Sequence, residues 1–97
     1  MQDRRFLLLP RADRDLEDIW LYTCQRWARD HADMYQRELN AVFEALAAGT
    51  KRGRMVDVRS GYFKYAHRVH VVYFREREDA IEIVRILHGR MDVGRHL

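Results

Sequence analysis

The residues best suited to chemistry lie at the end of the chain. Residues 81–97 read IEIVRILHGRMDVGRHL, which combines two histidines with three arginines. A metal-independent ribonuclease needs a base, an acid and cations that stabilise phosphate charge in the transition state. A histidine such as His88 can act as acid or base, while Arg85, Arg90 and Arg59 can bind a phosphate. Nuclease chemistry would therefore depend on Arg59, Arg85 and His88.

The same segment suits protein–protein contact better, and we favour that interpretation. Arg85 and His88 point to opposite faces of a strand, so they converge only if the strand ends or bulges near Leu87. Gly89 and Gly94 predict a loose tail that carries both apolar and hydrogen-bonding side chains. A tail of this kind can contact a target protein. The expected target-binding residues are His88, Arg90, Met91, Asp92, Arg95, His96 and Leu97.

Composition argues against several other kinds of site. Cys24 is the one cysteine, so an internal disulfide and a cysteine-based zinc site are excluded, and we expect Cys24 to be a small buried hydrophobe. His67 and His70 are three residues apart, but no carboxylate–histidine spacing recurs, so we expect neither metal nor cofactor. We expect His70 to be a hydrogen-bonded histidine on the sheet.

Length and charge bound the class of protein. The 97 residues fit one domain spanning 1–97, and the net charge of +3 is too mild to establish nucleic-acid binding. The apolar runs are too short for a membrane span or a signal peptide. We therefore expect a cytoplasmic domain that does not enter a membrane.

The elements that position these residues follow from periodicity. Residues 4–9 predict a strand that stops at Pro10, and residues 10–27 predict a helix with apolar side chains at steps of three and four. A second helix is expected after Asp30 as N-cap and before Gly49 as C-cap. The two tryptophans of the first helix, Trp20 and Trp27, are expected in the core, although they could anchor a partner.

The second half of the chain changes to a period of two. Residues 50–61 predict a loop, and three strands are expected at 62–66, 69–75 and 80–87. The order is β-α-α-β-β-β, an α+β fold in which an αα-hairpin packs on one face of a mainly antiparallel sheet. The basic stretch at 51–54 could bind phosphate or could simply be solvated, and we favour the latter.

Four stretches together resemble the ParE toxins of the RelE/ParE superfamily of type II toxin–antitoxin systems. They are RDLEDIWLYTCQRW, RSGYFKY, HVVYFR and IEIVRILHGRMDVGRHL. The resemblance covers nearly the whole chain, and its last stretch is the most specific. It implies the fold given above and a non-enzymatic toxin of a plasmid or chromosome maintenance system. Such a toxin inhibits DNA gyrase and is silenced by a ParD-like antitoxin.

The resemblance leaves alternatives open. RelE-like relatives are ribosome-dependent mRNA endonucleases on the same fold, and a third possibility is a fold that has lost its toxicity. The antitoxin is expected to carry an acidic segment that folds on binding, and nucleic acid is expected only indirectly, through gyrase or the antitoxin. Apolar side chains in excess of one buried face predict the antitoxin-binding residues, which are Leu21, Tyr22, Tyr62, Phe63 and Tyr65.

Two positions depart from the family pattern. Leu9 replaces the usual Ser or Thr before the first helix, and residues 67–69, HRV, replace the usual Gly-Ser type of turn. The missing turn glycine predicts an altered hairpin geometry.

Overall fold

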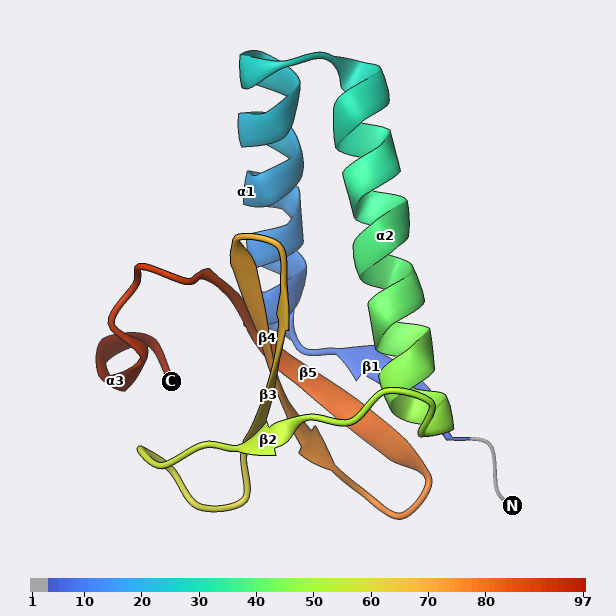
Figure 1. The fold of residues 1–97 in the computed structure, drawn as a ribbon, viewed down its shortest axis with the longest axis vertical. Helices are drawn as coiled ribbons and strands as arrows, with labels where there is room; N and C mark the ends of the chain where they lie inside the picture. Colours follow the sequence, from blue (N-terminus) through green and yellow to red (C-terminus); the bar gives the residue numbers. More distant parts are fainter. Residues whose placement is uncertain (1–3) are drawn as a thin grey trace.

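Five strands and three helices make up the described part of the chain (Figure 1). The structure is a computed structural model and describes residues 4–97. The elements are β1 (Arg5–Leu8), α1 (Pro10–Arg26), α2 (Arg29–Ala48), β2 (Arg54–Met55), β3 (Phe63–His67), β4 (His70–Glu76), β5 (Ala80–His88) and α3 (Val93–His96). The sheet order is β1-β5-β4-β3-β2, with β1 parallel to β5 and every other pair antiparallel. The predicted architecture is confirmed, and β2 and α3 are additions to it.

The two long helices begin and end for local reasons. α1 begins at Pro10, as predicted, because a proline in the first turn needs no hydrogen-bonded N–H. α2 begins at Arg29 with Ala28 as N-cap, so the prediction that Asp30 caps this helix is wrong. Asp30 lies instead in the first turn, where its charge suits the helix dipole. α2 ends at Ala48, and the left-handed φ of 85° at Gly49 confirms the predicted C-cap.

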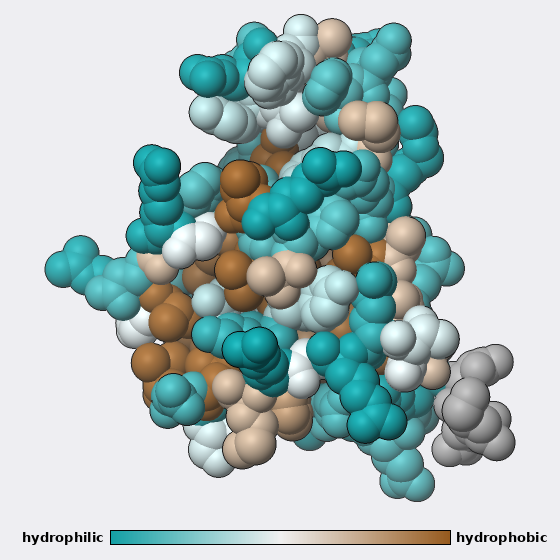
Figure 2. All heavy atoms as spheres, viewed as in Figure 1, coloured by the Kyte–Doolittle hydropathy of each residue, from teal (hydrophilic) through white to brown (hydrophobic). Residues whose placement is uncertain are grey.

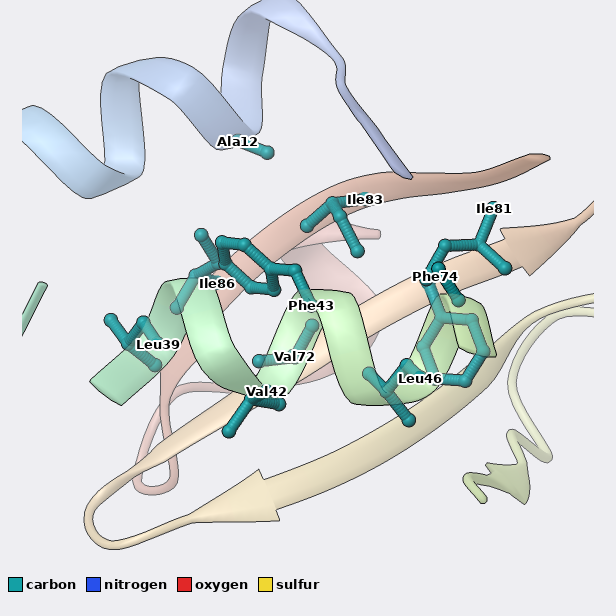
Figure 3. Close-up of a cluster of buried hydrophobic side chains, with 11 residues drawn as sticks. Ala12, Leu39, Val42, Phe43, Leu46, Val72, Phe74, Ile81, Ile83 and Ile86 are labelled. Atoms are coloured by element: carbon teal, nitrogen blue, oxygen red, sulfur yellow. The ribbon is translucent and has the colours of Figure 1, made fainter. Parts of the chain in front are cut away.

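The main core lies between the helical hairpin and one face of the sheet, which we call the helix face. Figure 3 shows its side chains between α2 and the strands. Phe43 packs against Phe6 of β1 in a tilted arrangement, with ring centroids 5.4 Å apart. The buried members are Ala12, Leu39, Val42, Phe43, Leu46, Ala47, Val72, Phe74, Ile81, Ile83 and Ile86.

The opposite face of the sheet, which we call the open face, carries a smaller cluster beneath α3. In the space-filling view, apolar residues gather at the left, around the position of α3 (Figure 2). Val93 and Leu97 pack against this cluster, and the Asp92 carboxylate accepts a hydrogen bond from the Gly94 N–H at 3.0 Å. The prediction of a loose tail is therefore wrong, because these contacts fold residues 93–96 into a helix. The buried members of the cluster are Val56, Tyr62, Tyr73 and Leu87.

The helical hairpin is longer than the sheet it covers. Figure 1 shows α1 and α2 extending past the turn between β3 and β4. Trp27 lies on this overhang with 68% of its surface exposed, so the prediction that it belongs to the core is wrong. Trp20 is half-buried, and its Nε1 donates to Asp33 Oδ1 at 2.9 Å. Cys24 is also half-buried rather than buried.

Among the described residues, no helix is long and apolar enough to cross a membrane.

Candidate functional site

A groove of about 880 Å³ opens where the hairpin overhangs the sheet. We call it the hairpin groove; α1, α2, the β3–β4 turn and the end of β5 line it. Its rim is unusually apolar for a surface, because Tyr22, Trp27 and Val69 are 61%, 68% and 56% exposed. Met34 and Met91 add two flexible apolar side chains. Exposed apolar groups that gather in one place mark an interaction surface.

The floor of the groove contains hydrogen-bonded polar groups. The Tyr35 hydroxyl lies 2.7 Å from His70 Nδ1, which confirms that His70 is hydrogen-bonded on the sheet. Burial, with His88 and His67 nearby, lowers the pKa of His70 to about 4. His70 is therefore neutral at pH 7, and the tautomer of its ring decides which partner donates, since the Tyr35 hydroxyl also lies 3.4 Å from the His67 carbonyl oxygen as a donor. Burial next to the Glu38 carboxylate raises the pKa of Tyr35 to about 12.

An ion-pair cluster holds the β3–β4 turn against α2. The Arg68 guanidinium donates to both Glu38 oxygens at 2.8 and 3.1 Å, and His67 Nε2 lies 2.9 Å from Glu38 Oε1. These hydrogen bonds, that of Arg68 first, lower the pKa of Glu38 to about 2. Arg68 adopts a left-handed φ of 52°. Because this turn has no glycine, a residue with a side chain must take the left-handed conformation. The Glu38–Arg68 pair compensates for the strained backbone and places Val69 on the groove rim.

Arg85 joins three elements at the edge of β5. Its Nε and Nη2 donate to the Asp15 carboxylate of α1 at 2.8 and 2.9 Å, and its Nη1 donates to the His96 carbonyl at 3.0 Å. Asp15 also accepts from the Ile86 N–H at 2.9 Å. Both charged side chains are nearly buried. The hydrogen bonds from Arg85 to Asp15 raise the pKa of Arg85 above its usual value.

The three nuclease candidates do not form one cluster, although Arg85 and His88 both line the hairpin groove. Arg85 is opposite Tyr73 in the ladder, and His88 is opposite His70, so the two lie on opposite faces of β5, as parity predicts. The bulge in β5 lies before Arg85, at the register shift between Tyr73 and Phe74, and leaves their relation unchanged.

The third candidate, Arg59, lies on the open face. Its guanidinium is 4.9 Å from the Tyr62 ring centroid and donates to the Leu97 carbonyl. All three nitrogens of the Arg85 guanidinium are already hydrogen-bonded. This arginine therefore connects β5 to α1 and α3 and is not placed to bind a phosphate.

The predicted antitoxin-binding residues are distributed over several surfaces. Leu21 and Tyr22 are exposed, as predicted, but Leu21 lines a second hollow of about 850 Å³ between the helices. The premise that the aromatic residues are surplus surface is wrong for Tyr62, which is 7% exposed in the open-face cluster. Phe63 and Tyr65 are half-buried and pack against the main core.

The predicted target-binding residues fall into two groups. His88, Arg90, Met91, Asp92 and Arg95 are exposed, while His96 and Leu97 are half-buried by the folded tail. The groove residues that sequence reasoning missed are Met34, Val69 and, by its exposure, Trp27. The sequence could have indicated them, because it places apolar side chains near the tip of the helical hairpin, beyond the length that short strands can cover.

Within residues 4–97, no group of three or more histidine, cysteine or acidic side chains is arranged to hold a metal ion.

Comparisons with known proteins cover nearly the whole chain. The family model for the ParE toxin of type II toxin–antitoxin systems, parDE, matches residues 6–93. Toxin ParE1 of Mycobacterium tuberculosis is 43% identical over 95 residues, which cover 96% of this chain and 97% of the relative. Toxin ParE1 of Caulobacter vibrioides is 40% identical over 93 residues, which cover 95% and 96%.

A solved chain from the chromosomal ParDE toxin–antitoxin system of P. aeruginosa shares the fold. Its TM-score is 0.77 at 18% identity, with coverage of 89% of this chain and 96% of that chain. ParE toxins act by binding rather than by catalysis, in line with the expectation of a non-enzyme. The chain belongs to the ParE toxin family of type II toxin–antitoxin systems.

Proposed function

We propose that this toxin inhibits DNA gyrase and is silenced by a ParD-like antitoxin that occupies the hairpin groove. The observation that carries the antitoxin part is the exposed aromatic pair of the groove, Tyr22 and Trp27. Large aromatic side chains are the anchors on which protein interfaces most depend. A toxin that acts on gyrase works in the cytoplasm, where gyrase and the chromosome or plasmid are found.

The groove suits a segment that folds as it binds. An amphipathic helix lays apolar side chains into such a groove, and the polar groups of the floor already have partners: Tyr35 pairs with His70, and Glu38 pairs with His67 and Arg68. Arg26, whose guanidinium lies 5.8 Å from the Tyr22 ring centroid, provides a cation at the rim. An acidic antitoxin segment would complement it.

Silencing follows from the geometry of the proposed contacts. Met91 belongs both to the hairpin groove and to the exposed tail segment proposed to contact gyrase. An antitoxin segment in the groove therefore covers part of the target-binding surface. The two partners compete for Met91, and Arg90 next to it is screened as well.

The antitoxin contact is tested by titration calorimetry with the cognate antitoxin. Trp27→Ser is expected to weaken binding by at least about tenfold, because truncating an interface anchor costs roughly 1–2 kcal/mol or more. Val58→Ser is the matched control, because Val58 is similarly exposed but lies outside the groove. Equal affinities for the two variants would contradict this placement of the antitoxin.

The gyrase contact is tested by inhibition of supercoiling. Arg90→Gln and Met91→Ser remove exposed side chains of the tail, for which no structural role in α3 packing is evident. Both are expected to reduce inhibition while the circular dichroism spectrum stays unchanged. Full inhibition by both variants would move the target contact away from this segment.

A further inference from the structure

A concentration of positive charge lies at the β2 end of the sheet and has no role in the groove. Residues 50–64 contain five lysines and arginines and one acidic residue, Asp57. Arg52, Arg54 and Lys64 are all exposed. Within residues 4–97, none of these three side chains takes part in an ion pair or a hydrogen bond.

The positions of these cations are set by a close backbone approach at Gly53. A Cβ at this position would lie 2.7 Å from the Phe74 ring and 2.8 Å from the Lys64 carbonyl oxygen, so a side chain does not fit. The glycine lets the basic loop press against β3. Arg52 and Arg54 are therefore held on either side of the contact with Lys64 rather than at the tip of a free loop.

The register of β2 and β3 brings two of these charges together. Arg54 is directly opposite Lys64 in the antiparallel ladder, and Lys64 is opposite Tyr73 of the open face. Like charges directly opposite each other across two strands destabilise the pairing. Among residues 4–97 no acid forms an ion pair with either cation, so this short edge strand is suited to receive an anion.

We propose that Arg52, Arg54 and Lys64 form a docking surface for the phosphate backbone of duplex DNA. The toxin then touches DNA directly, which goes beyond the indirect contact expected from the sequence and beyond the proposed binding of gyrase. Lysine and arginine bind backbone phosphates without reading sequence. A row of cations across neighbouring strands is suited to successive phosphates.

The aromatic residues of this face favour a duplex over a single strand. Proteins that bind single strands stack bases on exposed aromatic rings. Tyr62 and Tyr73 are each only 7% exposed, and the guanidiniums of Arg59 and Arg75 lie 4.9 and 5.5 Å from the Tyr62 ring centroid. The surface therefore offers charge without a stacking platform, as a backbone contact with a duplex requires.

Fluorescence anisotropy with a labelled 20-base-pair duplex and purified toxin tests this surface. We expect weak binding that falls with added salt, with a slope of about −3 in log–log form for three phosphates. Arg54→Gln/Lys64→Gln is expected to weaken binding about tenfold and to reduce the slope by about two. Arg14→Gln/Arg29→Gln is the matched control, because it removes the same charge from exposed positions on α1 and α2.

The outcomes distinguish binding at this surface from binding that depends only on the overall positive charge of the protein. Equal weakening by the two double variants, or no duplex binding at 50 mM salt, would overturn the proposal. Tighter binding of a single-stranded RNA of the same length would overturn the assignment to duplex DNA. The melting temperature of Arg54→Gln/Lys64→Gln should be unchanged or higher, because a like-charge pair is removed. Since gyrase is absent, the result is independent of the proposed inhibition of gyrase.

Discussion

Removing the Asp15 carboxylate is the sharpest test of how this toxin is held together. In Asp15→Ala, the Arg85 guanidinium loses both acceptors at 2.8 and 2.9 Å, and the Ile86 N–H loses its acceptor. The Asp15 and Arg85 side chains are only 13% and 11% exposed, so water cannot easily replace these bonds. Breaking one partner of a buried ion pair costs about 3–5 kcal/mol.

Such a loss is a large part of the 5–15 kcal/mol that stabilises a typical domain. Urea unfolding followed by circular dichroism should therefore show a much lower midpoint for Asp15→Ala. The double variant Asp15→Leu/Arg85→Met should recover much of the loss, because an apolar pair leaves no buried charge. A cost below about 1 kcal/mol for Asp15→Ala would refute a structural role for Arg85, as would a double variant no more stable than the single one.

Three further predictions concern stability. Burial and two neighbouring histidines lower the pKa of His70 to about 4, whereas a histidine in the unfolded chain titrates near 6.5. Neutral His70 therefore stabilises the fold fully above pH 6.5, and this contribution is lost as the pH falls toward 4. Discounted for partial exposure, the loss is about 1–2 kcal/mol, and urea unfolding of His70→Gln should lack this pH dependence. In urea unfolding, Arg68→Gly should be about 1 kcal/mol more stable than Arg68→Ala, since glycine adopts the left-handed conformation at this position without strain. Equal urea midpoints for the two variants would argue against backbone strain. Gly53→Ala should cost about 1–3 kcal/mol by thermal melting, whereas Gly89→Ala, whose nearest neighbour is 3.5 Å away, should cost much less.

The sequence predicts the elements that have strong periodicity. α1, α2 and the last three strands follow from apolar spacing of three to four or two residues, and Pro10 and Gly49 mark helix ends by backbone chemistry. The two short elements, β2 and α3, lack any such period. One local feature of the sequence does indicate α3: Asp92 is its N-cap and accepts a hydrogen bond from the Gly94 N–H, two residues further along the chain.

The candidate site was less predictable, because periodicity gives the face of a helix but not how far that helix extends past a sheet. Trp27 repeats the helical position of a core residue, yet it caps the end of α1, and Figure 1 shows that end of the hairpin beyond the strands. Tyr62 shows the converse, since α3 and Arg59 cover a face that appeared free in the sequence. Arg85 looked like a phosphate ligand because its partner, Asp15, is 70 residues away along the chain.

The most direct test of the proposed function is a supercoiling assay with purified gyrase, the toxin and its antitoxin, in which wild type is compared with Trp27→Ser. We expect both toxins to inhibit supercoiling and the antitoxin to restore gyrase activity fully with wild type. At the same antitoxin concentration, activity with Trp27→Ser should stay inhibited, because the exposed anchor of the hairpin groove is gone. No inhibition by the folded wild-type toxin would contradict gyrase as the target, and equal rescue of both toxins would contradict the groove as the site of silencing.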